Sequence, residues 1–175
     1  HILLKYFNSQ TFTSRQNPSD TSVYVSNCLF RSITSSSPGG ALYSTSVTLL
    51  LIESSSFSSC KTSSSYGAIC FSNSNSGQCV LHKVCGYDCR STNGNSYQFA
   101  YICVKGVASS KNYANYSSIT RCVNEISESW HIFGLQYGKT FCLSVNISLN
   151  KCYYHSGISC WPTSDSNYFT SSLTY

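Results

Sequence analysis

The sequence has few charged residues, no methionine and no long apolar run. Only 10% of its 175 residues are charged, far below the roughly 25% usual for globular domains. Serine, followed by Asn, Thr and Tyr, takes their place. A disordered chain combines high charge with few aromatic residues, whereas here 14% of the residues are aromatic and 41% are hydrophobic. The chain is therefore expected to fold, and its length allows one domain with a real core.

The same absences exclude several classes of protein. The net charge is only +5 and the basic residues are spread singly, so no nucleic-acid partner is expected. No run approaches the ~18 apolar residues of a membrane span, and the segment that begins at His1 is too short for a signal peptide. Because the chain has no Met, we interpret it as a piece of a longer protein.

One eleven-residue window recurs along the chain. Leu50–Cys60 reads LLIESSSFSSC, in which a short apolar alternation precedes a Phe and a small final residue. The related windows are Val23–Ile33, Cys79–Cys89, Asn112–Cys122 and Cys142–Cys152. Their final positions (33, 60, 89, 122 and 152) are 27, 29, 33 and 30 residues apart. Four successive intervals near thirty residues indicate a repeat architecture.

A second strand-like segment lies between these windows. It reads GGALYSTS from Gly39, YGAICFSN from Tyr66, FAYICVKG from Phe99 and WHIFGLQYG from Trp130, with a shorter SGISCWP from Ser156. Two or three short strands in each period, joined by Gly/Ser/Asn turns, are typical of a parallel β-helix coil. An antiparallel sandwich also has short strands, but it does not predict that each window resembles the one a full period earlier.

We therefore predict an all-β fold, a parallel β-helix (solenoid) of about five to six coils of ~27–33 residues. Residues 1–22 are predicted to form an N-terminal partial coil or cap. Residues 23–175 are predicted to form the repeats and to stop in mid-coil, as a fragment of a longer solenoid.

Eleven cysteines without a CxxC pair predict stacked columns of sulfur. Equivalent residues of successive coils lie about 4.8 Å apart, within reach of a disulfide. The predicted columns are Cys60, Cys89, Cys122 and Cys152, and, separately, Cys70 with Cys103. They form either disulfides of an oxidising compartment or free thiols that act as small core residues. Direct stacking gives poor Cβ geometry for a bridge and favours free thiols, although an off-column pair that includes Cys85 remains a candidate disulfide.

The candidate metal ligands are weak. His82, Cys85 and Cys89 have a spacing that suits zinc only if Gly86 supplies a turn. On an extended strand, residues three and four apart point to opposite faces. No metal and no other cofactor are therefore predicted.

Two further patterns suggest surface sites. A basic residue adjoins the end of four windows: Lys61, Arg90, Arg121 and Lys151. Stacking of the windows would align these residues as a stripe that suits anionic glycans. Solvated charges in turns explain the same pattern without a ligand. Glycosylation sequons occur at Asn115 and at Asn146, and the first is the stronger candidate because Asn146 is expected to be half-buried.

The acidic residues do not suggest catalysis. Glycoside hydrolysis needs two carboxylates at a fixed distance, and no two of the six acids occupy equivalent positions of adjacent windows with a basic partner. The chain also has no Asp-Asp pair and no GHG, RIK or GxSxG sequence. We therefore predict that it is not an enzyme.

Several long runs resemble a known family. VSNCLFRSITSSSPGGALYSTS, SSYGAICFSNSNSGQCVLHKVCGYDC, SSKNYANYSSITRCVNE and VNISLNKCYYHSGISC are similar to the Ser/Cys/Tyr-rich parallel β-helix proteins of trichomonad parasites, from about Val23 to Tyr175. GGAL at Gly39 is similar to the GGAI motif of bacterial polymorphic outer membrane proteins. The resemblance implies a right-handed, pectate-lyase-like solenoid and a surface or adhesion protein, and it supplies no catalytic residues.

The predicted function is a non-enzymatic spacer and interaction surface of a cell-surface or secreted protein, with carbohydrate or protein ligands. One alternative is a degenerate carbohydrate-active enzyme whose catalytic coils lie outside this piece. Another is an intracellular structural solenoid that associates end to end with copies of itself.

Overall fold

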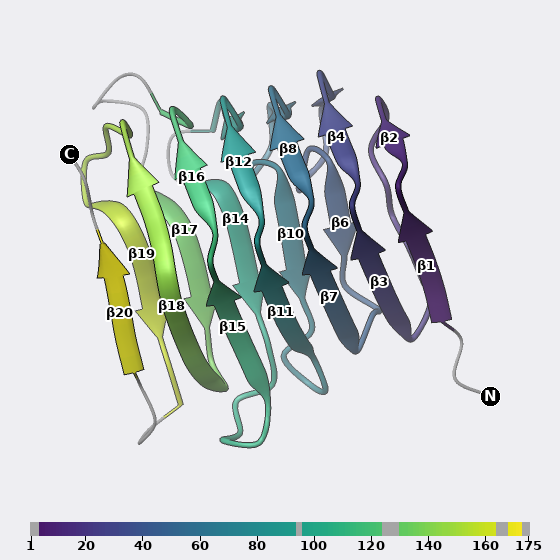
Figure 1. Ribbon diagram of the computed structural model, residues 1–175, viewed down its shortest axis with the longest axis vertical. Helices are drawn as coiled ribbons and strands as arrows, with labels where there is room; N and C mark the ends of the chain where they lie inside the picture. Colours follow the sequence, from purple (N-terminus) through teal and green to yellow (C-terminus); the bar gives the residue numbers. More distant parts are fainter. Residues whose placement is uncertain (1–3, 94–95, 124–129, 164–167, 173–175) are drawn as a thin grey trace.

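The computed structural model describes residues 4–93, 96–123, 130–163 and 168–172. Every regular element in these ranges is a β-strand, so the all-β prediction is confirmed for this part of the chain. The strands form three sheets, and every pairing between them is parallel. In Figure 1 the strands stand side by side, with β1 and β20 at opposite ends of the row.

The largest sheet, sheet A, has two limbs that share β18. The first limb consists of β1 (Leu4–Asn8), β3 (Ser22–Ser26), β7 (Leu49–Glu53), β11 (Gln78–His82), β15 (Lys111–Asn115), β18 (Lys139–Ser148) and β20 (Tyr168–Ser172). The second limb consists of β2 (Thr11–Phe12), β4 (Leu29–Arg31), β8 (Ser56–Ser58), β12 (Cys85–Tyr87), β16 (Ser118–Thr120) and the end of β18.

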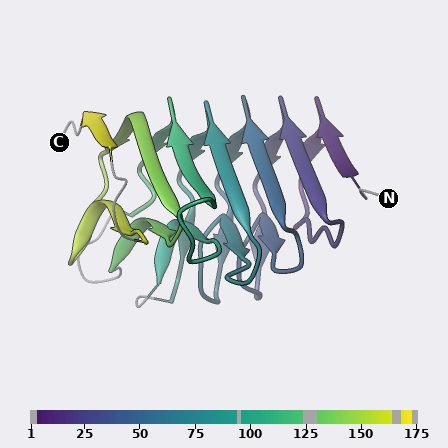
Figure 2. The same ribbon diagram turned by 90° about the horizontal axis from the view of Figure 1, so that it is seen from below.

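Two smaller sheets complete the fold. Sheet B contains β6 (Leu42–Ser44), β10 (Ile69–Ser72), β14 (Tyr97–Cys103), β17 (His131–Gln136) and β19 (His155–Trp161). Sheet C contains β5 (Thr34–Ser35), β9 (Lys61–Thr62) and β13 (Arg90–Ser91). Figure 2 shows sheet B as a separate layer beneath the first limb of sheet A. The prediction that the second segment of each period is a strand is confirmed, including the short one near Ser156, and these strands together form sheet B.

The chain visits the sheets in a fixed order. It passes from the first limb to the second, then to sheet B, and returns to the first limb beside its previous strand; in three successive repeats a strand of sheet C (β5, β9 or β13) precedes the strand of sheet B. The predicted windows are aligned, because Val23 pairs with Leu50 and Leu50 with Cys79. The predicted start of the last window at Cys142 is wrong by two residues, because Asn112 pairs with Thr140.

The N-terminal segment follows the same course. Strands β1 and β2 pair with β3 and β4 in the two limbs of sheet A. Gln16 then forms a parallel bridge with Leu42 of sheet B. Part of the predicted cap, from Leu4 to Gln16, therefore has strands in both limbs of sheet A and a bridge to sheet B, as the later repeats continue them.

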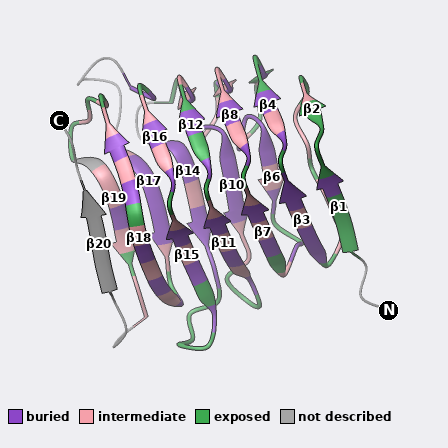
Figure 3. Cartoon of the chain, in the orientation of Figure 1, coloured by how far each residue is buried: buried purple, intermediate pink, exposed green. Residues whose placement is uncertain are grey.

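The core lies between the sheets and is filled by alternate strand residues, which Figure 3 shows in the colour for buried residues. Its centre is a column of aromatic rings in the second limb. The rings of Phe12 and Phe30 lie 4.7 Å apart, and those of Phe30 and Phe57 lie 4.6 Å apart and nearly parallel. Gly86 occupies the next position of the column, and the ring of Phe99 from sheet B fills the space above it, within contact of Phe57.

Two corners of each repeat are turned by one residue with a left-handed backbone. The corner between the limbs of sheet A uses Ser9, Asn27, Ser54, Lys83, Tyr116 and Ser144, and the corner before sheet C uses Ser32, Ser59, Asp88, Arg121 and Leu149. Their φ angles lie between 46° and 57°, a region that residues other than Gly rarely occupy. The parallel ladder continues through the corners, since the N–H of Ser54 donates to the His82 carbonyl at 2.9 Å.

We expect Leu149→Gly to stabilise the protein. Leu149 has φ 57° and is 56% exposed, so the change removes backbone strain and little buried surface. The free energy of unfolding should rise by about 0.5–1 kcal/mol. The control is Leu49→Gly, at an exposed leucine within strand β7, which should lower it by a similar amount. Urea denaturation measures both, and a loss of stability in both variants would contradict the prediction.

Candidate functional site

The outer face of sheet B carries a cluster of aromatic side chains. Alternate residues of a strand point to the same side of a sheet, and Tyr101 points outward between the inward Ala100 and Ile102. The cluster, called here the sheet B patch, comprises Tyr66, Tyr97, Tyr101, His131, Gln136 and Trp161. These residues come from three successive strands of the sheet and from the turn before β10.

The rings of the sheet B patch contact one another. Tyr66 stacks on Tyr101 with ring centroids 4.3 Å apart and an interplanar angle of 12°. Tyr97 lies 5.1 Å from Tyr101 and stacks on His131 at 4.7 Å. These contacts hold the rings as one surface across β14 and β17, because each ring is supported by the next.

One amide side chain links two of the phenols. The hydroxyl of Tyr101 donates to Gln136 Oε1 at 2.9 Å, and Gln136 Nε2 donates to the hydroxyl of Tyr97 at 3.2 Å. Gln136 in turn pairs in register with Trp161 of β19, whose side chain is 61% exposed. The patch therefore combines ring surface with fixed polar groups.

A glycine makes room for one of the rings. A Cβ at Gly134 would lie 2.2 Å from Cε1 of Tyr97, so only glycine allows this ring to lie over strand β17. The ring of Tyr97 is therefore positioned by the backbone of the neighbouring strand as well as by its aromatic neighbours.

Two phenols and one thiol of this face are protonated at physiological pH. Burial is the largest cause that raises the pKa of Tyr101 well above its ordinary value, and burial likewise raises the pKa of Tyr66. Cys70 pairs with Tyr101 in the sheet, and burial raises the pKa of its thiol to about 12. Such groups donate and accept hydrogen bonds but do not act as bases or nucleophiles.

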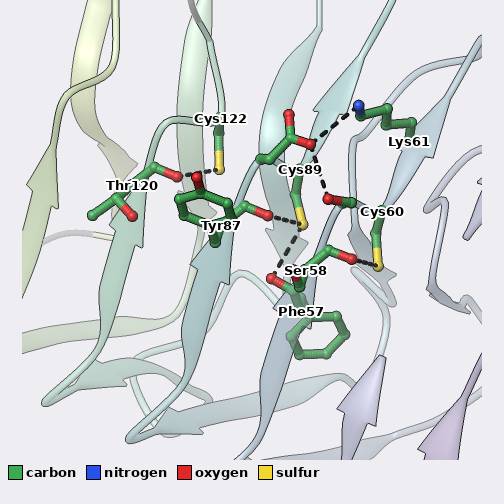
Figure 4. A network of polar contacts seen from close by, with 10 residues as sticks. Phe57, Ser58, Cys60, Lys61, Tyr87, Cys89, Thr120 and Cys122 are labelled. Carbon is green, nitrogen blue, oxygen red and sulfur yellow. Dashed lines mark hydrogen bonds and ion pairs between the residues drawn. The ribbon is translucent and has the colours of Figure 1, made fainter. Parts of the chain in front are cut away.

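The buried cysteines of the second corner form a shorter column than predicted (Figure 4). Ile33, Cys60, Cys89 and Cys122 follow the corner residues of successive repeats. The thiol of Cys89 donates to the carbonyls of Phe57 at 3.3 Å and Tyr87 at 3.4 Å. Burial raises the pKa of Cys122 to about 12, so its thiol is protonated at neutral pH and serves as a core residue.

The prediction that Cys152 continues this column is wrong, because Asn150 occupies the position. The Asn150 amide donates to the carbonyls of Ile119 at 3.0 Å and Ser148 at 2.9 Å, as the cysteine thiols do in earlier repeats. Its Oδ1 accepts the N–H of Cys122 at 2.7 Å. An amide side chain, bonded to the equivalent carbonyls of its own repeats, thus takes the place of the thiol in this column.

The predicted pair of Cys70 with Cys103 is also wrong. Cys70 pairs with Tyr101, and Cys103 pairs with Ser72. The matching letters of YGAICFSN and FAYICVKG are out of register by two residues, a shift that keeps every side chain on its face. The cysteines of the second corner, Cys70, Cys103 and the exposed Cys85 are free thiols.

The candidate metal ligands do not converge. His82 and Cys85 lie toward the surface, whereas Cys89 is in the core. Within the described ranges no three His, Cys, Asp or Glu residues are placed to hold a metal ion.

The predicted basic stripe is not one straight column. Lys61 and Arg90 are paired in sheet C, but Arg121 occupies the neighbouring corner column. The backbone N–H of Lys151 donates to the carbonyl of Val123, which lies two residues after Arg121. Lys61 forms an ion pair with Asp88 at 3.1 Å, which lowers the positive charge of the edge. Anion binding here stays a prediction.

Both sequon asparagines are half-buried on strands of sheet A. The hydroxyl of Ser117, the third residue of the first sequon, points inward and donates to the Asn115 carbonyl at 3.0 Å. Glycosylation at Asn115 and at Asn146 stays a prediction.

Comparison of the chain with protein-family models, curated proteins and solved structures gives no match. The resemblance to the trichomonad β-helix proteins therefore stays a prediction. Among the residues that the structure describes, none belongs to a helix with the length and apolar character to cross a membrane.

Sequence reasoning missed the sheet B patch. The only signal was that tyrosines recur near the start of the second strand-like segment, as in SSYGAIC and SYQFAY. Its residues become neighbours through the lateral pairing of β14 with β17, which contains a register shift after Tyr97. The repeat period of the sequence does not predict which side chains meet across two strands whose register shifts.

Proposed function

We propose that the chain is a segment of a right-handed parallel β-helix that serves as a spacer and interaction surface of a cell-surface or secreted protein. The repeated passage of the chain through the two limbs of sheet A and then through sheet B supports the helical course. The handedness rests on the general preference of parallel crossovers. No catalytic role is proposed, because burial keeps the thiols of Cys70 and Cys122 protonated and Asp88 is paired with Lys61.

We further propose that the sheet B patch binds carbohydrate. A sugar ring presents an apolar C–H face to an aromatic ring and hydroxyl groups at its edge, so it needs ring surface with neutral polar groups beside it. The observation that carries this proposal is the hydrogen-bonded set Tyr97–Gln136–Tyr101 next to the exposed ring of Trp161. The hydroxyl, amide and indole groups of the patch suit a neutral ligand.

The test is binding of neutral tetrasaccharides of glucose, mannose, galactose and N-acetylglucosamine, measured by calorimetry. At least one should bind the unmodified chain, and Trp161→Ala should weaken that binding by about tenfold, because truncation of an aromatic anchor costs more than about 1 kcal/mol and about 1.4 kcal/mol is tenfold in affinity.

The control is Tyr87→Ala, at a tyrosine of β12 that is 49% exposed and lies on sheet A. This change should leave binding unaltered. Failure of every tetrasaccharide to bind, or an equal effect of both variants, would contradict the proposed carbohydrate site.

A further inference from the structure

The solvent face of the first limb of sheet A has an apolar row that the core does not explain. In β7, Leu50 and Ile52 point into the core, whereas Leu51 points outward between Leu49 and Glu53. The parallel register aligns Leu51 with outward residues of five other strands. The row, called here the sheet A stripe, consists of Tyr6, Tyr24, Leu51, Val80, Tyr113 and Phe141.

The sheet A stripe is a continuous surface. The rings of Tyr6 and Tyr24 stack at 4.9 Å, and those of Tyr113 and Phe141 meet edge to face at 5.7 Å. A shallow hollow of about 410 Å³ lies between these ends, over Leu51 and Val80, and is lined mainly by apolar side chains. The register continues from Phe141 to Tyr168, whose side chain lies outside the description. Apolar solvent faces of this kind mark interaction sites.

The order of residue types in the stripe is symmetric about its centre. It runs aromatic, aromatic, aliphatic, aliphatic, aromatic, aromatic from β1 to β18. A two-fold axis that lies in the face, parallel to the strands and between β7 and β11, reverses this order in a second copy. It places Tyr6 opposite Phe141, Tyr24 opposite Tyr113, and Leu51 opposite Val80.

The ionisable residues beside the stripe fit the same axis. Glu53 and His82 are paired neighbours in the column next to the stripe, so the axis puts the Glu53 carboxylate of one copy opposite the His82 imidazole of the other. Lys111 and Lys139 lie on the other side of the stripe at one end, and the axis separates them from the lysines of the second copy. A two-fold axis perpendicular to the strands would instead place Glu53 against Leu49.

We propose that the sheet A stripe is the contact face of a two-fold symmetric dimer of this chain. Such an interface uses one self-complementary patch twice. Six strands at about 4.8 Å spacing and five residues at about 3.3 Å give a face of about 29 by 17 Å. Two such faces bury about 1,000 Å² in total, which is at the low end of specific interfaces. The dimer is therefore expected to dissociate in the micromolar range. This proposal is independent of the carbohydrate site on sheet B.

The experiment is sedimentation velocity from about 1 to 200 µM. The unmodified chain should shift from monomer to dimer across this range. Leu51→Lys and Val80→Glu should each weaken dimerisation at least about tenfold, because each places an unpaired charge against an apolar residue. Tyr87→Lys, at an exposed residue of the second limb, is the matched control and should dimerise like the unmodified chain.

Mixing the two variants tests the symmetry itself. The axis brings the new lysine of Leu51→Lys opposite the new glutamate of Val80→Glu, while Val80 of the first variant meets Leu51 of the second. An equal mixture should therefore form heterodimers that neither variant forms alone, which also shows that both variants are folded. A chain that stays monomeric at the highest concentration overturns the proposal, as do a dimer unaffected by both substitutions and a mixture that fails to associate.

Discussion

Phe99→Ala is expected to lower the free energy of unfolding by about 3–5 kcal/mol, as is usual when a buried ring is removed. Phe99 is fully buried and meets Phe57 and Phe133 edge to face, with centroids 6.1 and 6.0 Å away. It occupies the space that Gly86 leaves in the aromatic column of the second limb. Its removal therefore opens a cavity where sheets A and B join. Urea denaturation followed by circular dichroism measures the loss.

A complementary substitution at Gly86 tests whether the ring of Phe99 fills the space that this glycine leaves. A Cβ at Gly86 would lie 2.4 Å from Cε2 of Phe99, so Gly86→Ala should cost about 1–3 kcal/mol through overpacking. When Phe99→Ala is already present, the added methyl group enters the cavity. Gly86→Ala should then raise the free energy of unfolding by at least about 1 kcal/mol instead of lowering it. Phe141→Ala, on the half-buried outer face, is the control and should cost far less. Strictly additive effects of the two changes would contradict this explanation.

Gly67→Ala should be as damaging, for a different reason. A Cβ at Gly67 would lie 1.6 Å from the carbonyl oxygen of Gln98, a backbone atom of the next repeat that cannot rotate away. The N–H of Gly67 donates to the Tyr97 carbonyl at 2.8 Å, so the two repeats are held together at this point. We expect a loss of at least about 3 kcal/mol or failure to fold, measured by urea denaturation and near-ultraviolet circular dichroism.

Gly106 provides a matched control for Gly67. The nearest atom to a Cβ at Gly106 is Thr163 Oγ1 at 3.9 Å, and its backbone does not require a positive φ. Gly106→Ala should change stability by no more than about 0.5 kcal/mol. A similar small effect at Gly67 would show that the repeats are not so closely packed there.

The period of the sequence predicted the parallel strands and their order well, because a repeated window must pair with its neighbours to bury its apolar face. Register was harder to predict. The errors at Cys152 and at Cys70 with Cys103 are both shifts of two residues, which leave inside and outside unchanged. The corner residue decides the register. Leu149 is a corner residue with a left-handed backbone, but a leucine side chain gives no indication of that conformation in the sequence. The sheet B patch could not be predicted, because it depends on how Tyr97, Gly134 and Gln136 meet across strands.

The single-residue corners also decide where the chain can vary in length. The segment that contains both corners has eleven residues in four successive repeats: 23–33, 50–60, 79–89 and 112–122. The separations between the end of one such segment and the start of the next are 17, 19 and 23 residues (33 to 50, 60 to 79 and 89 to 112). An insertion at a corner would break the ladder, whereas one in the turns on either side of sheet B need not. Natural insertions and engineered loops can therefore be accommodated beside sheet B, the face proposed to bind sugar, while the sheet A stripe keeps its spacing.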